Sequence, residues 1–298
     1  ANTAYLETFS PVATSLPSLL QPDCDHAAEP HPLALMANYI IALVSSASDP
    51  DTMTFNEAMQ STDRDEFIKA MHKELADHIG RNHWKIVPLN SIHYPQHAIP
   101  MVWAMKRKRN PIGDIIKWKA RLCAGGHRAI ENVDYWSTYS PVVSWSTVRL
   151  MIVFALLNDW HMESIDFILA YPQAPIQTDI YMQPPRVPPN FIIPDLPDPT
   201  NRLTKAYKLI KNLYGQKQAG RVWNEYLVEG LIKWGFKQSK VDECVFYKGK
   251  TILLVYVDDA ILCGPSSKAI DDIITLLKEG SDITDEGEID DYLGVKVT

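Results

Sequence analysis

The hydrophobic pattern of the chain is clearest at residues 251–264, where two apolar runs flank a pair of acidic residues. Ile252–Val257 and Ala260–Cys263 are rich in aliphatic and β-branched side chains, which is typical of buried strands. Asp258 and Asp259 lie between the runs, and Asp tolerates the dihedral angles of a tight turn. The pattern therefore predicts two short strands joined by a turn.

Apolar residues recur with helical spacing in four other stretches. The first begins near Thr62, whose spacing to Asp65 resembles a capping box, and stops at Gly80. Its core-facing residues are Phe67, Ile68, Met71, Leu75 and Ile79. The second is Ser144–Trp160, with Val148, Ile152, Ala155, Leu156 and Trp160 available to a core. The other two are Arg221–Trp234 and a helix that buries Ile270, Ile273, Ile274 and Leu277.

Strand-like runs fill the region between the first two helices. Trp84–Leu89 and Met101–Met105 predict strands, and Ile115–Cys123 returns after a turn at Asn110–Asp114. The last two runs form a hairpin. On its returning arm three cations alternate with other residues, which places all three on one face of the strand: Lys117, Lys119 and Arg121.

Two stretches are rich in proline. Residues 1–52 contain six prolines among many Ser, Thr and Ala residues, and predict a linker or partly ordered leader with a short helix near Leu33–Val44. Residues 184–200 contain seven prolines and predict an extended loop.

Length and composition are those of a globular protein. With 298 residues, 46% of them hydrophobic, the chain can bury a core as one large domain or two coupled ones. It contains no apolar run of the length that a membrane span needs, so we expect no membrane association. We also find no secretion signal, and the four widely spaced cysteines fit neither a disulfide framework nor a zinc site. An intracellular protein with reduced thiols is expected.

The charge is unevenly distributed. The chain carries a net charge of −7, which argues against a generally basic nucleic-acid binder. Between Lys106 and Arg128, however, eight Lys and Arg residues stand against one acid, Asp114. This concentration of positive charge favours an anionic partner.

Pattern alone leaves two alternatives open at each charged feature. The row of cations on the hairpin suits a triphosphate, and it equally suits a strand edge guarded by charge. Asp258 and Asp259 either remain solvated in a turn or hold a divalent cation, because two adjacent carboxylates cannot be buried without a partner.

A series of motifs, in order and at similar spacings, resembles the reverse transcriptase of copia-type retrotransposons. In the first half of the chain the matching segments are Glu57-Ala58-Met59, Ala70-Met71-x2-Glu74, Trp103-x2-Lys106, Lys119-Ala120-Arg121-Leu122, Val133-Asp134-Tyr135, Tyr139-Ser140-Pro141-Val142-Val143 and Thr147-Val148-Arg149. In the second half they are Asp166-x4-Tyr171, Ile180-Tyr181-Met182-Gln183-Pro184-Pro185, Tyr214-Gly215-x-Lys217-Gln218, Tyr256-Val257-Asp258-Asp259 and Gly287-x5-Tyr292-Leu293-Gly294.

The resemblance implies an α+β right-hand polymerase fold, with fingers and a palm whose antiparallel sheet is backed by helices. The expected organisation is a leader at 1–52, fingers at 53–150, and a palm with the start of the thumb at 151–298. Most of the thumb is expected to be missing, as are ribonuclease H and integrase domains, so that the chain represents a fragment of a polyprotein.

The resemblance also implies a two-metal polymerase site. Its metal-binding and catalytic residues would be Asp166, Asp258 and Asp259, with two Mg²⁺ ions or Mn²⁺ as an alternative. Its nucleotide-binding residues would be Lys119, Arg121, Tyr171 and Gln218, where the ring of Tyr171 excludes a 2′-hydroxyl. Its template-binding residues would be Lys106, Lys108 and Lys117.

The implied activity is RNA-directed DNA synthesis, from dNTPs, on an RNA or DNA primer-template. Departures from the family pattern occur at Gln216, at Ile168-Leu169, where Lys-Thr is usual, and at Pro172-Gln173-Ala174. The altered stretch after Asp166 and the expected truncation of the thumb leave open an inactive nucleic-acid-binding remnant. A Mg²⁺-dependent phosphohydrolase that uses the same carboxylates is a further alternative. By the same resemblance, the expected locations are cytoplasmic virus-like particles and the nucleus.

Overall fold

The computed structural model describes residues 49–110, 112–192, 204–289, 291–292 and 295–296. The leader up to residue 48, with the helix expected at Leu33–Val44, lies outside the described residues. So do residues 193–203, which include the last part of the proline-rich stretch 184–200. Within the described part, no helix is long and apolar enough to cross a membrane. Cys123, Cys244 and Cys263 are free thiols there.

A six-stranded antiparallel sheet contains the predicted hairpin. Its order is β13-β6-β12-β11-β10-β9. The strands are β6 (His161–Phe167), β9 (Lys237–Gln238), β10 (Val245–Lys248), β11 (Thr251–Tyr256), β12 (Asp259–Gly264) and β13 (Ile283–Glu288). The pairing of β11 with β12, from Ile252 opposite Cys263 to Tyr256 opposite Asp259, confirms the hairpin.

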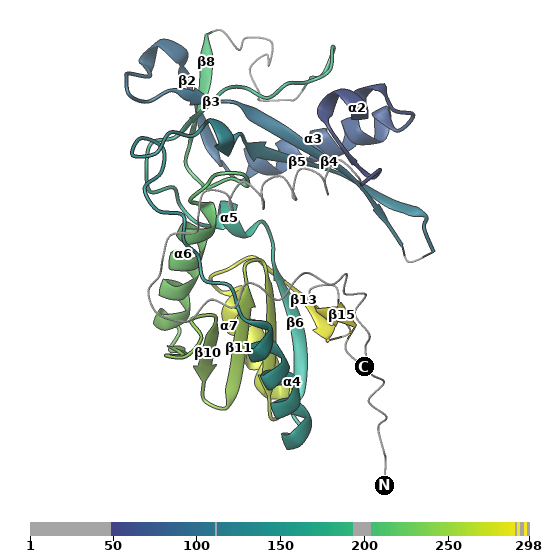
Figure 1. The fold of residues 1–298 in the computed structure, drawn as a ribbon, viewed down its shortest axis with the longest axis vertical. Helices are drawn as coiled ribbons and strands as arrows, with labels where there is room; N and C mark the ends of the chain where they lie inside the picture. Colours follow the sequence, from purple (N-terminus) through teal and green to yellow (C-terminus); the bar gives the residue numbers. More distant parts are fainter. Residues whose placement is uncertain (1–48, 111, 193–203, 290, 293–294, 297–298) are drawn as a thin grey trace, which may run out of the picture. The chain divides into compact units, whose positions relative to one another are not determined.

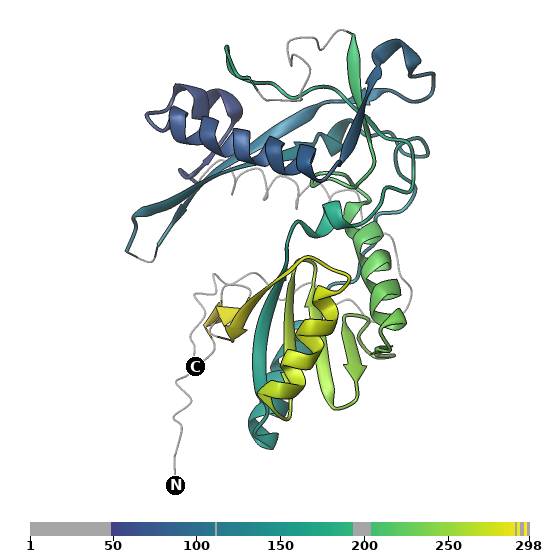
Figure 2. The same cartoon turned by 180° about the vertical axis from the view of Figure 1, so that it is seen from behind.

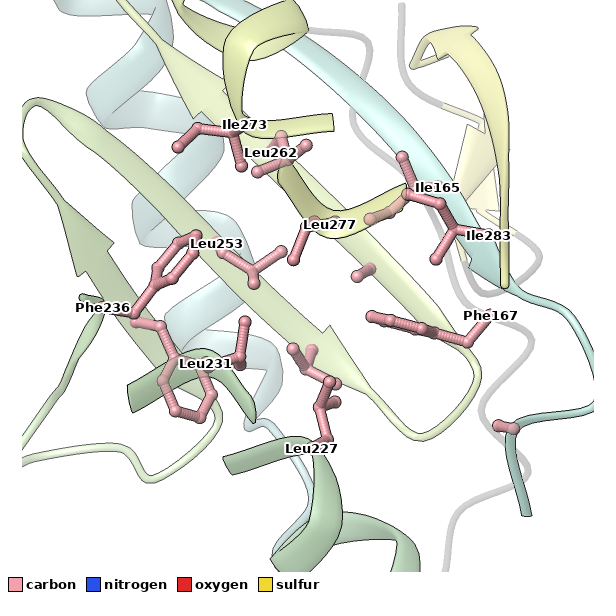
Figure 3. Packing of buried hydrophobic residues seen from close by; sticks show 14 of the residues in the cluster. Ile165, Phe167, Leu227, Leu231, Phe236, Leu253, Leu262, Ile273, Leu277 and Ile283 are labelled. Atoms are coloured by element: carbon pink, nitrogen blue, oxygen red, sulfur yellow. The ribbon is translucent and has the colours of Figure 1, made fainter. Parts of the chain in front are cut away.

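Helices cover both faces of this sheet (Figures 1 and 2). Side chains alternate along each strand, so Leu253 of β11 joins one core cluster and Leu254 joins another. The Leu253 face packs against α6 (Ala219–Lys233) and α7 (Ser267–Lys278). Figure 3 shows side chains from both helices meeting those of the strands: Leu227 and Leu231 from α6, Ile273 and Leu277 from α7, and Ile165, Leu253 and Leu262 from the sheet.

The opposite face packs against α4 (Trp145–Asn158). Ser144 caps this helix, because its hydroxyl accepts the Thr147 N–H. The prediction that Leu156 contributes to the core is wrong, since its side chain is 76% exposed. The helix is apolar on most of its surface, but only the stripe facing the sheet is buried, and Leu156 lies beside that stripe.

A second, three-stranded sheet has the order β1-β4-β5, with β1 at Thr52–Met53, β4 at Met101–Arg109 and β5 at Ile115–Ala124. It packs against α2 (Phe55–Gln60) and α3 (Arg64–Gly80). The predicted core residues Phe67, Met71 and Leu75 of α3 are fully buried there.

The start of these helices differs from the prediction. The capping box forms at Thr54 and Glu57, at the beginning of α2, and not at Thr62. Asp63 is the N-cap of α3, yet its side chain makes no cap hydrogen bond. Its carboxylate instead accepts N–H groups of Arg107 (2.5 Å) and Trp118 (3.0 Å) from the hairpin.

A four-stranded sheet with the order β2-β8-β7-β3 joins distant segments. Its strands are β2 (Trp84–Pro88), β3 (Ala98–Ile99), β7 (Tyr181–Met182) and β8 (Lys205–Leu209). They come from both sides of residue 150, where the sequence predicts the boundary between fingers and palm. The remaining elements are η1 (Leu89–Ser91), η2 (Gly126–Arg128), α5 (Ala170–Gln173), β14 (Asp291–Tyr292) and β15 (Val295–Lys296).

Candidate functional site

The turn between β11 and β12 consists of Val257 and Asp258. Tyr256 pairs with Asp259, which already belongs to β12. Val257 has a φ of 56°, in the left-handed region that β-branched residues avoid. The indole N–H of Trp223 donates a 2.7 Å hydrogen bond to the carbonyl oxygen of Val257. This bond from the buried side chain of Trp223 in α6 stabilises the turn in its unfavourable conformation.

Strand pairing brings Asp166 to the same end of the sheet. Asp166 is directly opposite Asp259 in the β6–β12 ladder. The N–H of Phe167 also donates to the carbonyl oxygen of Asp258, at 2.8 Å. The three predicted catalytic aspartates, from two distant segments, therefore lie at neighbouring strand ends.

The carboxylate of Asp258 is bonded through one of its two oxygen atoms. Its Oδ2 accepts a 3.1 Å hydrogen bond from the hydroxyl of Tyr214, while its Oδ1 is buried and has no hydrogen-bond partner among the residues that the structure describes. Burial raises the pKa of this carboxyl, and the Tyr214 hydrogen bond and the charge of Arg121 oppose that rise. A buried acceptor without a partner is a position that a cation would satisfy.

The aspartates fit a hard cation in chemistry, because carboxylate oxygens are the ligands that Mg²⁺ prefers. Among the residues that the structure describes, however, no group of three or more His, Cys, Asp or Glu side chains is gathered to hold a metal ion. Mutual repulsion of ionised carboxylates keeps such groups apart unless a cation is bound. The metal role of Asp166, Asp258 and Asp259 stays a prediction.

The side chains of Arg121, Tyr171 and Tyr214 lie together beside Asp258. The guanidinium carbon of Arg121 lies 4.0 Å from the centre of the Tyr214 ring. The ring of Tyr171, in α5, lies 4.8 Å from the same ring, centre to centre. Burial raises the pKa of Tyr171, and the charge of Asp258 adds to the rise. Tyr214 thus connects two predicted nucleotide-binding residues with the acidic turn.

Glycines allow the Tyr214 segment to approach β5 closely. The N–H of Ala124, at the end of β5, donates a 2.7 Å hydrogen bond to the carbonyl oxygen of Tyr214. Gly215 has a φ of 85°, and a Cβ there would lie 2.3 Å from the carbonyl oxygen of Ala124. A Cβ on Gly126 would lie 2.1 Å from the carbonyl oxygen of Gly215. Only glycine permits this contact.

Lysines gather on the exposed face of the β4–β5 hairpin. Lys106 is directly opposite Lys119, and Lys108 is directly opposite Lys117. Burial lowers the pKa of Lys119, and the charges of Arg121, Lys108 and Lys117 lower it further. Like charges in facing positions are destabilising, so this face is suited to an anionic partner.

Two arginines of the same basic run have acidic partners in the fold. Arg107 binds Asp63, and Arg109 makes a two-pronged contact with Asp51 at 2.7 and 2.9 Å. The sequence predicts positive charge over this whole run, whereas the structure reserves part of it for holding the hairpin.

Gln218 occupies the N-cap position of α6, and its side chain is buried. Its amide group donates a 3.1 Å hydrogen bond to the carbonyl oxygen of Asp134. In this structure its side chain thus holds a neighbouring loop, and the nucleotide contact stays a prediction.

The departures after Asp166 form a locally bonded segment. Leu169 has a left-handed backbone, with a φ of 51°. The Gln173 amide donates to the carbonyl oxygens of Ile168 and Asp282, both at 2.8 Å, and its oxygen accepts the N–H of Asp282. These bonds tie α5 to Ile168, which follows β6, and to Asp282, which precedes β13.

Comparison with known proteins supports the motif-based resemblance. Residues 81–298 match the family model described as reverse transcriptase (RNA-dependent DNA polymerase). The chain belongs to the reverse transcriptase family. The sequence prediction of this family is confirmed.

The chain is similar to Pol polyproteins of copia-type transposons. It is 31% identical over 257 residues to the retrovirus-related Pol polyprotein from transposon RE1 of Arabidopsis thaliana, covering 85% of this chain and 17% of that protein. It is 29% identical to the RE2 polyprotein of the same plant, covering 87% and 17%, and 26% identical to that of transposon TNT 1-94 of Nicotiana tabacum, covering 86% and 18%. The chain thus spans less than a fifth of the length of each of these relatives.

Two residues of the site carry no predicted role in the sequence: Tyr214 and Trp223. Tyr214 belongs to the Tyr-Gly motif that carries part of the resemblance. The motif marks this residue in the sequence but does not reveal its contact with Asp258. Trp223 has only the pattern of a packed helix residue, so its bond to Val257 requires the fold.

Proposed function

We propose that this chain contains the RNA-directed DNA polymerase domain of a copia-type retrotransposon polyprotein. The observation that carries the proposal is the convergence of Asp166 and Asp259, paired across β6 and β12, with Asp258 in the adjoining turn. The family match supports the reaction class. The partners would be an RNA or DNA primer-template and dNTPs.

Asp166 and Asp258 would hold two Mg²⁺ ions, with Asp259 as a supporting carboxylate. When bound, such ions activate the primer 3′-hydroxyl and neutralise charge on the triphosphate and the leaving pyrophosphate. The unpartnered Oδ1 atom of Asp258 supports this assignment, because it offers a buried acceptor at the acidic turn. Attachment to three paired strands would keep the carboxylates in place between turnovers.

The cationic and aromatic residues would position the nucleotide and template. Arg121 and Lys119 would bind the triphosphate, since their positive charges neutralise phosphate oxygens. Tyr171 would lie beneath the incoming sugar and exclude a 2′-hydroxyl. Lys106, Lys108 and Lys117 would contact template phosphates from the exposed hairpin face, and Gln218 would contact the nucleotide or the template base pair.

In a right-hand polymerase, the six-stranded sheet with α6, α7 and the part of α4 after residue 150 would be the palm. The β4–β5 hairpin with α2 and α3 would belong to the fingers, over residues 53–150. The palm and the beginning of the thumb would occupy residues 151–298. The strands β7 and β8 would return to the fingers side, because they pair with β2 and β3.

The proposal is tested by extension of a labelled DNA primer on an RNA template, with Mg²⁺ and dNTPs. Wild-type protein should extend the primer, and Asp258→Asn should reduce the rate by at least about 10³-fold, as expected when a metal ligand is lost. Asp272→Asn, on the exposed side of α7, is the matched control and should retain activity. Extension by Asp258→Asn at the wild-type rate would refute the proposal.

Two other results would assign a different function. Salt-sensitive template binding without extension would favour an inactive nucleic-acid-binding remnant. Phosphodiester hydrolysis in the absence of dNTPs, lost in Asp258→Asn, would favour a phosphohydrolase.

A further inference from the structure

We propose that Tyr214 is a positioning residue that orients the Asp258 carboxylate with its hydroxyl and the Arg121 guanidinium with its ring. The inference rests on the proposed function, because it concerns how the cation-binding and triphosphate-binding residues are held before substrates arrive. It assigns a role to a residue that neither binds the cation nor takes part in the reaction.

The hydroxyl of Tyr214 fixes the rotation of the carboxylate. It donates to Oδ2 of Asp258 at 3.1 Å, and Oδ1 is left as a buried acceptor without a partner. A carboxylate with one oxygen bound and the other free has a defined orientation. Partners of this kind fix the geometry of metal-binding carboxylates and raise their affinity.

The ring of Tyr214 supports a cation on its face. The Arg121 guanidinium lies 4.0 Å from the ring centre, which is within the range of a favourable cation–π contact. Since Arg121 projects from β5 and Asp258 from the β11–β12 turn, one side chain links the two halves of the site.

The backbone prevents Tyr214 from moving away. Its carbonyl oxygen accepts the Ala124 N–H at 2.7 Å, and the close contact of Gly126 with Gly215 locks the following residue against β5. The side chain is itself 9% exposed. A buried ring on a clamped backbone is a rigid support.

A buried tyrosine could contribute packing alone, so the test separates the hydroxyl from the ring. Tyr214→Phe removes only the hydroxyl, and Tyr214→Leu removes the ring as well. Tyr207→Phe is the matched control, because Tyr207 is buried and its hydroxyl has no hydrogen-bond partner within the described part of the chain. Both phenylalanine variants thus lose one buried hydroxyl from the same chain.

The first readout is Mn²⁺ binding to the full chain without nucleic acid or nucleotide, measured by electron paramagnetic resonance. Tyr214→Phe should raise the dissociation constant for Mn²⁺ by about tenfold, and Tyr207→Phe should raise it by less than about twofold. In primer extension, KM for dNTP should rise in Tyr214→Leu and stay near the wild-type value in Tyr214→Phe, since only the former loses the support of Arg121.

The outcomes separate this inference from the proposed function. If Asp258→Asn abolishes Mn²⁺ binding but Tyr214→Phe binds Mn²⁺ as wild type does, the positioning role is overturned and the proposed function stands. If Asp258→Asn leaves Mn²⁺ binding unchanged, both are overturned. An equal loss in Tyr214→Phe and Tyr207→Phe would reduce Tyr214 to a packing residue and also overturn the inference.

Discussion

Substitution of Val257 should reverse the usual order of stability between alanine and glycine. Val257 has a φ of 56°, and a residue with a Cβ in this left-handed region costs about 1–2 kcal/mol. Glycine avoids that cost but loses about 0.5–1 kcal/mol more conformational entropy on folding than alanine does. The difference between these two ranges runs from about 0 to about 1.5 kcal/mol, and its mid-point predicts that Val257→Gly is more stable than Val257→Ala by about 0.75 kcal/mol. Both variants lose the two γ-methyl groups of valine, and glycine also loses the β-carbon, so the comparison needs the same pair of substitutions at a residue with ordinary strand geometry.

The assay is urea denaturation of the two variants, with Val255 as the matched control. Val255 is buried within β11, one residue before Tyr256. There the ordinary order applies, and Val255→Gly should be less stable than Val255→Ala by about 0.5–1 kcal/mol. If glycine is the less stable variant at both positions by the same margin, the strain assigned to the turn does not exist.

Two further predictions concern buried contacts. Gly126→Ala should destabilise the fold by about 3 kcal/mol, because its Cβ would meet the carbonyl oxygen of Gly215 at 2.1 Å. Gly80→Ala is the control and should not destabilise the fold, because nothing lies within 4 Å of a Cβ at that position. Equal midpoints of urea denaturation for the two variants would contradict this prediction. Burial lowers the pKa of His83, which lies against His78, from 6.5 to about 3. Below about pH 6.5 the imidazole of His83 is therefore protonated in the unfolded chain but not in the folded one. The free energy of unfolding then falls by up to about 1.4 kcal/mol per pH unit as the pH decreases. His83→Gln should therefore lose less stability than wild type between about pH 7.5 and about pH 5.5, and parallel losses would show that His83 is not buried in its neutral form.

The sequence predicts the elements of this fold best where one periodicity dominates. The hairpin is two unbroken apolar runs, and α7 buries all four residues that helical spacing selects. The helix α3 buries Phe67, Met71 and Leu75 fully, and Ile68 and Ile79 in part. The position of the turn is less well predicted. Asp favours turns, so Asp258 and Asp259 are the expected tip, whereas pairing of Asp259 with Asp166 draws it into β12 and leaves Val257 in the turn.

Most residues of the candidate site are predicted from the sequence, but the contacts between them are not. Resemblance selects Asp166 and Asp258 as individual residues, but the hydrogen bond of Asp258 to Tyr214 depends on β5, the glycine contact and the hairpin together. Some cations of the basic hairpin form ion pairs within the fold, and their spacing in the sequence does not reveal these partners. Arg107 binds Asp63, the N-cap residue of α3, whose side chain makes no cap hydrogen bond.

The most direct test of a shared catalytic site is the rate of single-nucleotide incorporation on an RNA template by Asp166→Asn, Asp258→Asn and the double variant. Residues that act as one unit have non-additive effects on rate. Each single variant should lose at least about 10³-fold in rate, and the double variant should be no slower than the slower single variant. Incorporation by Asp166→Asn at the wild-type rate would contradict the account, because the pairing of β6 with β12 would then bring no catalytic carboxylate to the turn.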